Sequence, residues 1–180
     1  MHKKIILSLL FTLFLAVFLS ANIWLENILI KPFATDTQLE TLITNQNVSN
    51  QTFHNISQQQ RTLVHVTQSF CICSAYSSTH IQTLNALAEG QSIAVIDVAL
   101  DALTANQQND EWQNLIELIP STPATILINS KGKIEYIGPY SSGLTCNSGN
   151  SFIERFLTQP EGDLAIANWI NTGCYCTTDK

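Results

Sequence analysis

The chain has 180 residues, of which 45% are hydrophobic, so it can form one ordinary domain with a buried core and has little room for a second. Its net charge is -6, its pI is near 5.0, and Lys and Arg form no cluster outside the extreme N-terminus. A surface that binds a nucleic-acid backbone needs such a cluster, so nucleic acid is excluded as an expected partner.

The N-terminal residues have the composition of a membrane-spanning helix. After Lys3 and Lys4 no charged residue occurs before Glu26, and residues 5–25 are almost wholly apolar. At ~1.5 Å per residue this stretch can cross a ~30 Å hydrocarbon layer. It is longer than the apolar part of a cleaved signal peptide, which is the alternative, so we favour a retained anchor. In either case the two lysines predict a cytoplasmic N-terminus and a periplasmic domain at a bacterial inner membrane, in a single-pass arrangement.

Residues 31–60 are rich in Thr, Asn, Gln and Ser, which is typical of a polar linker. Within it we expect one short amphipathic helix over residues 35–45, with Thr35 or Asp36 as its N-cap. The apolar residues at helical spacing in this helix are Leu39, Leu42 and Ile43. The predicted organisation is therefore a membrane anchor (residues 1–30), a linker (31–60) and a main domain (61–176) that includes a cysteine-containing C-terminal tail.

The main domain shows alternating patterns of strands and helices. Strands are expected at residues 61–67, 92–100, 124–129 and 133–138, and helices at residues 74–88, 110–119 and 151–157. The first two strands are rich in apolar residues and are predicted to be buried, whereas the last two are joined by a tight turn and are predicted to pair antiparallel. The order strand-helix-strand-helix-strand-strand-helix predicts an α/β fold with a mixed sheet flanked by helices.

Several motifs in this order resemble the thioredoxin-like superfamily. Residues 70–74 (FCICS) follow the first strand, and residues 122–125 (TPAT) look like the family's cis-proline loop. Residues 126–138 are similar to the strand, turn and strand that follow this loop in membrane-tethered, extracytoplasmic members. The closing GCYC at residues 173–176 is similar to an uncharacterised bacterial branch that carries CxC in place of CxxC. The resemblance covers a little over half of the chain and implies a thioredoxin-like fold with four to five strands.

The resemblance places Cys71 at the position of the family's attacking cysteine. The start of a helix also favours a reactive thiolate physically, because its unpaired N–H groups and positive end stabilise negative sulfur. Attack on a substrate disulfide would give a mixed disulfide. The chain departs from the family because Cys73 comes one position early and Ser74 stands where the second cysteine should be. A Cys71–Cys73 bridge would be tight and easily reduced, as in an oxidant or isomerase, and the alternative is a pair that stays bridged or buried.

Three residues are predicted to support this site. The resemblance implies a cis peptide between Thr122 and Pro123, which would place backbone opposite the cysteine, where an extended substrate can pair as an added strand. An ordinary strand-initiating proline is the alternative. His65 stands where thioredoxin itself has a buried acid, so it is either a proton acceptor for a thiol or a hydrogen-bonded core histidine. His80 lies among polar helix residues and is expected at the surface.

The chain has five cysteines, so one remains free if the others bridge within it. Cys174 and Cys176 form a second CxC pair. We expect Cys146, in the loop after the strand pair, to bridge one tail cysteine and leave the other to exchange with the first pair, although the sequence does not fix this connectivity. Two CxC pairs could instead bind Cu(I) or Zn(II), but their spacing is shorter than in most structural zinc sites, and we expect no metal or other cofactor.

The leading functional interpretation is a thiol-disulfide oxidoreductase or isomerase-like enzyme that acts on exported protein thiols or disulfides, or on a redox partner protein, outside the membrane. It predicts that a mixed disulfide can be trapped when Cys73 is replaced by Ala. The alternatives are a Cu(I) or Zn(II) binding module and a non-catalytic scaffold with structural disulfides. Fold alone does not choose among them, but a cysteine at a strand-to-helix junction that faces a proline favours the first.

Overall fold

The structure is a computed structural model of residues 1–180, and it describes all of them except residues 1, 46–47, 49–50 and 179–180. The helices are α1 (His2–Leu29), α2 (Asp36–Asn45), α3 (His54–Ser57), α4 (Ile72–Gly90), α5 (Asp110–Glu117) and α6 (Glu154–Leu157). The strands are β1 (Ile30–Pro32), β2 (Thr62–Thr67), β3 (Ala94–Ala99), β4 (Ser121–Thr122), β5 (Ala124–Ile128), β6 (Ile134–Gly138), β7 (Ile166–Ala167), β8 (Thr172–Cys174) and β9 (Cys176–Thr177). Short 3-10 turns lie at Ala105–Gln107 and Ser148–Asn150.

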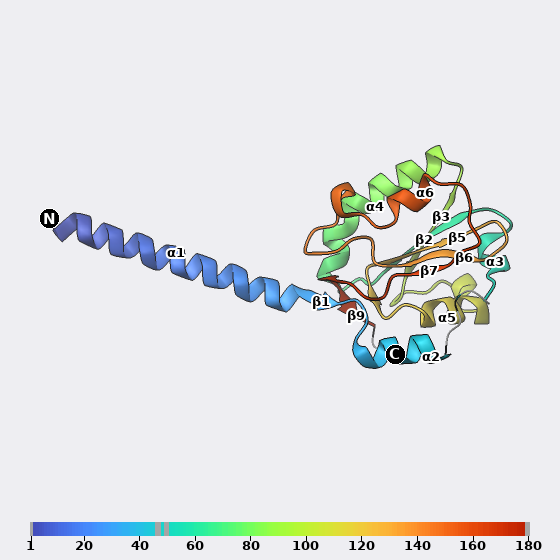
Figure 1. The fold of residues 1–180 in the computed structure, drawn as a ribbon, viewed down its shortest axis with the longest axis horizontal. Coiled ribbons are helices and arrows are strands. Elements are labelled where there is room, and N and C mark those ends of the chain that lie inside the picture. The colour runs from blue at the N-terminus through green and yellow to red at the C-terminus, as the bar shows by residue number, and fades with distance from the viewer. Residues whose placement is uncertain (1, 46–47, 49–50, 179–180) are drawn as a thin grey trace.

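The domain is built on a mixed five-stranded sheet with the strand order β3-β2-β5-β6-β7. β2 runs parallel to β3 and antiparallel to β5, the β5–β6 pair is antiparallel as predicted, and β7 runs parallel to β6. Helices α4 and α6 cover one face of this sheet and α5 covers the other (Figure 1). The predicted α/β fold with a mixed sheet flanked by helices is therefore confirmed.

Strand β2 lies between two helical layers, which explains why it has apolar residues on both faces. Leu63 packs with Leu84 of α4, whereas Val64 and Val66 pack with Leu115 of α5. Successive side chains of a strand point to opposite faces, so a strand that is covered on both sides carries apolar residues on both of them. β2 is thus a central strand, and the chain leaves it directly towards α4.

Strand β3 is more exposed than predicted. Residues 92–100 were expected to form a buried strand, but Val95 is 37% exposed and Val98 is the one buried residue of β3 itself. The reason is that β3 is an edge strand of the sheet. An apolar run predicts that a strand forms, but it does not give the position of that strand in the sheet.

The prediction that residues 31–60 form a spacer around one short helix is wrong for the part that the structure describes. Phe33, Phe53 and Ile56 are at most 4% exposed and belong to the core on the α5 side of the sheet. The Phe53 N–H donates to the Gly132 carbonyl oxygen at 2.7 Å, which ties the segment to the β5–β6 turn. Single apolar residues scattered through a polar segment have no periodicity, so pattern analysis does not detect their burial.

Helix α2 begins where the sequence predicts. The Thr35 N–H donates to Gln38 Oε1 at 2.9 Å and the Gln38 N–H donates to Thr35 Oγ1 at 3.4 Å, which is a reciprocal capping arrangement. Leu42 is buried and Leu39 packs against the core, whereas Ile43 is 66% exposed. The predicted apolar face of this helix is therefore correct for two of its three residues.

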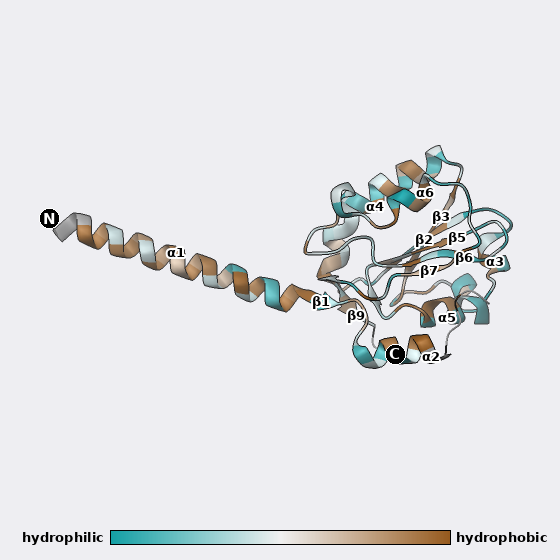
Figure 2. Cartoon of the chain, viewed as in Figure 1, coloured by the Kyte–Doolittle hydropathy of each residue, from teal (hydrophilic) through white to brown (hydrophobic). Residues whose placement is uncertain are grey.

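Within the described residues, one helix is long and apolar enough to cross a membrane, over Ile5–Leu29 of α1. It projects away from the domain (Figure 1), and hydrophobic residues predominate along it (Figure 2). β1 follows it directly and pairs antiparallel with β8, with Ile30 opposite Cys174. The end of α1 is therefore fixed beside the C-terminal tail.

Candidate functional site

Four cysteines from the two ends of the domain meet at the start of α4. Cys71 is the N-terminal cap of α4 and Cys73 lies in its first turn. Disulfides join Cys71 to Cys176 and Cys73 to Cys174. Cys71, Cys73 and Cys174 are at most 4% exposed, whereas Cys176 is only partly buried. Cys176 is therefore the most accessible of the four.

The tail reaches this site because its residues alternate in direction. Cys174 and Cys176 are two positions apart in an extended segment, so their side chains point the same way and Tyr175 points the opposite way. The Tyr175 hydroxyl donates to the Ser141 carbonyl oxygen at 2.6 Å, and its ring packs edge-on against Phe33 at 5.0 Å between centroids. A C-x-C pair on a strand thus presents both sulfurs to the helix while the middle residue anchors the strand.

Gly173 is required for this anchor. A Cβ atom at this position would lie 2.6 Å from the Tyr175 hydroxyl oxygen and 2.9 Å from the Gly143 carbonyl oxygen. That carbonyl oxygen accepts the N–H of Cys174 at 2.9 Å. The glycine therefore lets the tail lie directly against the loop that follows β6.

The predicted proline loop lies beside the cysteines. The peptide between Thr122 and Pro123 is cis, as expected. Cys71 Sγ is 3.6 Å from the Thr122 carbonyl oxygen. β4 pairs antiparallel with β9, with Thr122 opposite Cys176 and Ser121 opposite Thr177. The structure thus brings the predicted residues of the cysteine motif and the proline loop together, with the tail strand lying across them.

The cysteine pairing differs from the preferred arrangement. Cys146 was expected to bridge a tail cysteine, but it is a free thiol whose Sγ lies 3.2 Å from Ser77 Oγ. A bridge within the Cys71-x-Cys73 motif is not formed either, because each of its cysteines pairs with the tail. Both differences follow from the tail. The side chains of Cys174 and Cys176 point to the same side, so each can bridge one of the two cysteines at the start of α4.

His65 is buried and fully hydrogen-bonded. Its Nδ1 is 2.7 Å from the Tyr140 hydroxyl and its Nε2 is 2.7 Å from Asn85 Oδ1. Burial lowers the pKa of His65, and the hydrogen bond to Asn85 and the charge of Asp97 oppose this shift in part. Both ring nitrogens are hydrogen-bonded to residues other than a cysteine, so His65 matches the second of the two interpretations, a hydrogen-bonded core histidine.

The prediction that His80 lies at the surface is wrong. The residue is 2% exposed, its Nε2 is 3.1 Å from Ser151 Oγ and its Nδ1 is 3.7 Å from Glu154 Oε1. Burial lowers its pKa, and the charge of Glu154 opposes this shift. The reason for its burial is that α6 and the preceding loop pack over α4, which the polar sequence around His80 does not reveal.

We expect the protein to lose stability on acidification because of His65. Its folded-state pKa lies below the ordinary value of 6.5, so the unfolded chain binds a proton that the folded chain does not as the pH falls through this value. Between the ordinary and the lowered pKa, each pH unit removes about 1.4 kcal/mol from the free energy of unfolding. His65→Gln should reduce the difference between urea unfolding free energies at pH 7.5 and 5.5. If the natural protein and His65→Gln lose the same free energy of unfolding between pH 7.5 and 5.5, His65 is not the source of the acid sensitivity.

The sulfur cluster also has the composition of a soft-metal site. The Sγ atoms of Cys71, Cys73 and Cys176 lie within 4.8 Å of one another, and Cys174 is bonded to one of them. Thiolates are the ligands that Zn(II) and Cu(I) prefer, and metal binding requires them deprotonated and free. All four are held in disulfides, so these residues fit a metal only after both bridges are reduced.

Exposed apolar side chains border the buried sulfurs, which the sequence analysis did not single out. Phe70 is 98% exposed, Ile72 is 52% exposed and Tyr76 is 49% exposed. The first two flank Cys71 in sequence. Large apolar side chains that remain exposed next to a buried reactive group are candidates for contact with a binding partner. The signal available in the sequence was a pair of large apolar residues on either side of a cysteine.

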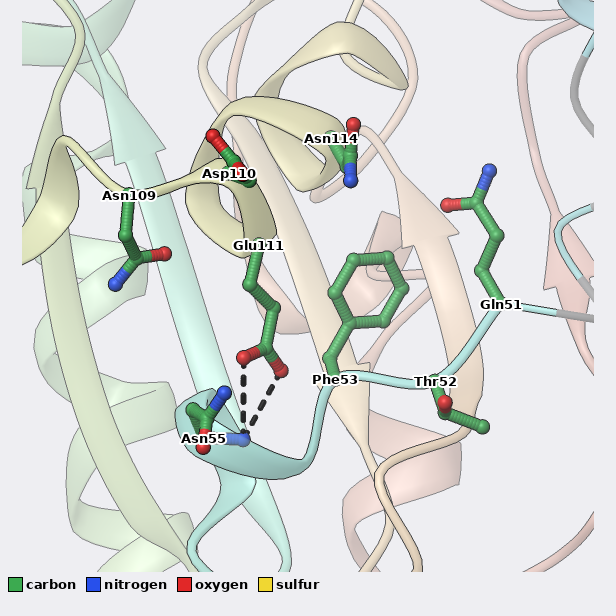
Figure 3. A pocket seen from close by; sticks show the side chains of 8 residues that line it. All are labelled: Gln51, Thr52, Phe53, Asn55, Asn109, Asp110, Glu111 and Asn114. Carbon is green, nitrogen blue, oxygen red and sulfur yellow. Dashed lines mark hydrogen bonds between the residues drawn. The ribbon is translucent and has the colours of Figure 1, made fainter.

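Residues of α3, of α5 and of the segments that precede them line a cleft (Figure 3). Both carboxylate oxygens of Glu111 accept the N–H of Asn55, at 3.0 and 3.2 Å. The carboxylate is therefore used to fix the start of α3. The residues that line this cleft include neither cysteine nor histidine.

Comparison with known proteins gives a family but no activity. Residues 40–178 match a family described as a domain of unknown function (DUF6436). No curated protein and no solved structure matches the chain. The cysteine cluster is therefore the feature of this chain that bears most directly on its activity.

Proposed function

This chain belongs to the DUF6436 family, whose description names no activity, and we propose that it is a thiol-disulfide oxidoreductase whose exchanging pair is Cys71 and Cys176. The observation that carries the proposal is the bridge itself. It joins the cap of a long helix to a strand that pairs with the residue preceding the cis proline. A cysteine with these neighbours has a stabilised thiolate on one side and a backbone edge for a second chain on the other.

The helix supplies the chemical reason for exchange at Cys71. Thiolates are the nucleophiles and leaving groups of disulfide exchange, and the unpaired N–H groups of a helix start stabilise the thiolate form. In the oxidised protein, an external thiolate attacks the bridge, and the sulfur that is released becomes a thiolate. A second external thiolate then attacks the mixed disulfide. The net reaction converts two external thiols and one protein disulfide into one external disulfide and two protein thiols, and it is reversible.

The second bridge, between Cys73 and Cys174, has a different role in this proposal. Both of its cysteines are buried, and it holds the base of the tail next to α4. Cys176 then takes the role of the second cysteine that the first motif lacks. This arrangement replaces the sequence-based hypothesis in which Cys73 resolves the mixed disulfide at Cys71.

We also propose that the fold is thioredoxin-like. Three features support this: the order of β2, α4, β3, α5, β5, β6 and α6, the cysteine at the start of α4, and the cis proline before β5. Disulfides persist in extracytoplasmic compartments, and the lysines in the first turn of α1 favour a cytoplasmic N-terminus. The proposed location is therefore the periplasmic side of a bacterial inner membrane, with exported proteins or a redox partner protein as reactants.

A soft-metal site is the second candidate, because the sulfurs of Cys71, Cys73 and Cys176 lie within 4.8 Å of one another and could bind one ion once both bridges are reduced. It predicts that the fully reduced protein retains stoichiometric Cu(I) or Zn(II) through gel filtration. An exchanging enzyme without a metal role would lose the ion under the same conditions.

The proposed function is tested with the oxidised full-length protein in detergent micelles and a reduced peptide that contains two cysteines. We expect the peptide to be oxidised in proportion to the protein added, and Cys71→Ser to abolish this reaction. Cys146→Ser is the matched control, because it removes the free thiol and leaves both bridges intact. Peptide oxidation that survives Cys71→Ser, or that is lost with Cys146→Ser, would contradict the proposal.

A further inference from the structure

We propose that β9 is an internal strap: it occupies the backbone edge of β4 and has to leave before an external chain can pair there and reach Cys71. The inference rests on the proposed function, because it takes Cys71 as the exchanging sulfur. It adds a regulatory element, namely a segment of the chain that competes with the substrate for the same strand position.

The edge of β4 is filled by the tail. In the described part of the chain, β4 pairs with β9 and with no other strand. An unpaired strand edge is a template for pairing with an extended polypeptide. Cys176 stands opposite Thr122 in this pair, and its sulfur is bonded to Cys71. The tail thus holds the position, and makes the covalent bond, that a cysteine-bearing substrate strand would take.

The strap is held less firmly than residues 172–175, which form the base of the tail. Apart from the disulfide and the short β4–β9 ladder, the hydrogen bonds of the strap among the described residues are those of the buried Thr178, whose N–H donates to the Pro120 carbonyl oxygen and whose Oγ1 donates to the carbonyl oxygens of Ile119 and Pro120 at 3.1 Å. Thr177 is exposed. The base, in contrast, has the second disulfide, the β1–β8 ladder and the buried Tyr175 ring. The strap can therefore open while the base remains in place.

The direction of the opening step follows from the exposure of Cys176 and from the stability of the Cys71 thiolate as the leaving group. An external thiolate attacks the Sγ of Cys176, which is the more exposed cysteine of the pair. The Cys71–Cys176 bond breaks, a bond between the external sulfur and Cys176 forms, and Cys71 leaves as a thiolate at the helix start. A stabilised thiolate is the better leaving group, so this direction of attack is favoured.

The surface beside the strap indicates what replaces it. Phe70 and Ile72 are exposed on either side of Cys71. An extended polypeptide that pairs with β4 would place side chains near these residues, and apolar ones would bury their surface. The expected occupant is therefore an extended, cysteine-bearing polypeptide segment with apolar residues next to its cysteine.

The test uses the full-length Cys176→Ser protein, in which Cys71 is free and the strap is held by its backbone contacts alone. Two peptide disulfides of one sequence serve as probes, one with a normal backbone and one N-methylated on both sides of its cysteine so that it cannot pair as a strand. Thr178→Pro is added to remove the N–H and hydroxyl contacts of the strap. We expect about a tenfold faster reaction of Cys71 with the normal peptide, and a much smaller change with the methylated peptide.

Each outcome of this experiment decides a different point. Equal acceleration of both peptides would show that β9 only shields the sulfur, and no acceleration of either would show that it does not compete at all; both overturn the proposal. A failure of Cys71 to react with either peptide in any variant would instead remove the proposed function. Thr178→Ser keeps both donors and is expected to react at the rate of the Cys176→Ser parent.

Amide hydrogen exchange provides a measurement that does not depend on these variants. In the natural sequence, reduction of the Cys71–Cys176 bridge alone should speed exchange of the Thr178 N–H at least about tenfold. The Cys174 N–H, which donates to Gly143 in the base, should keep its protection. Unchanged exchange at Thr178, or equal loss at both amides, would contradict a strap that opens independently of its base.

Discussion

Replacing Cys176 with Ser in the full-length protein is expected to convert Cys71 into a trap that reacts once with an external disulfide and remains bound to it. Cys71 is then a free thiol at the cap of α4, and the resolving sulfur is absent. Cys73 cannot replace it while it is bonded to Cys174. Mass spectrometry of the variant after incubation with a cysteine-peptide disulfide should show one added peptide on Cys71.

The expected rate distinguishes this cysteine from the other free thiol. A thiol whose thiolate is stabilised by a helix start is largely ionised near neutral pH, whereas an ordinary thiol is ionised to only a few per cent. Cys71 should therefore react at least about tenfold faster than Cys146 in the same protein. Equal rates, or an adduct on Cys146 alone, would contradict the assignment.

The Cys73→Ala variant is the informative comparison. The sequence alone predicts that it traps a mixed disulfide, because Cys73 is the nearest second cysteine. In the structure Cys71 is bonded to Cys176, so we now expect Cys73→Ala to turn over without a stable adduct. An adduct in Cys73→Ala and none in Cys176→Ser would restore the original hypothesis.

The second large effect is on stability, and it is expected to be strongly non-additive. The bridges span 105 and 101 residues and close almost the same loop. Chain-entropy arguments give about 4.7 kcal/mol for the first closure of a loop of this size, but only roughly 2 kcal/mol for a second bridge, which then closes a ring of a few residues. Removing either bridge should therefore cost about 2 kcal/mol, and removing both about 7 kcal/mol.

Urea unfolding followed by the fluorescence of the buried Trp112 and Trp169 measures these costs. The variants are Cys71→Ala/Cys176→Ala, Cys73→Ala/Cys174→Ala and all four together, with Cys146→Ser as the control that removes a cysteine but no bridge. A domain of ordinary stability, about 5 to 15 kcal/mol, would be marginal or unfolded without both bridges. If the free energies of unfolding lost with each single bridge add up to the loss with both bridges removed, the two bridges do not close the same loop as this account requires.

The longer strands and helices of the domain could be predicted from local patterns, whereas α3 and the short strands β1, β4, β7, β8 and β9 were not predicted. β2, α4, α5 and the β5–β6 hairpin each have a period or a turn signal that belongs to their own residues, and the structure contains them at nearly the predicted bounds. The edge position of β3 was not predicted, since a run of apolar residues looks the same in the centre and at the edge of a sheet. The burial of Phe33 was missed for a similar reason, because it depends on contacts distant in sequence.

The site could be predicted only in part. The cysteine motif and the proline before β5 have local signals, and the structure places them together. The position of the tail has no local signal, but its C-x-C spacing does carry information. In an extended segment this spacing puts both sulfurs on one side, which indicates a partner with two cysteines rather than a single one such as Cys146.

The central claim, that the bridge between Cys71 and Cys176 exchanges while the other one persists, is tested by alkylation of the natural full-length protein in graded glutathione buffers, read by peptide mass spectrometry. Cys71 and Cys176 should become labelled together under milder reducing conditions than Cys73 and Cys174, with the domain still folded. If the bridge between Cys73 and Cys174 opens first, or if both bridges resist reduction until the domain unfolds, Cys71 is not an exchanging cysteine.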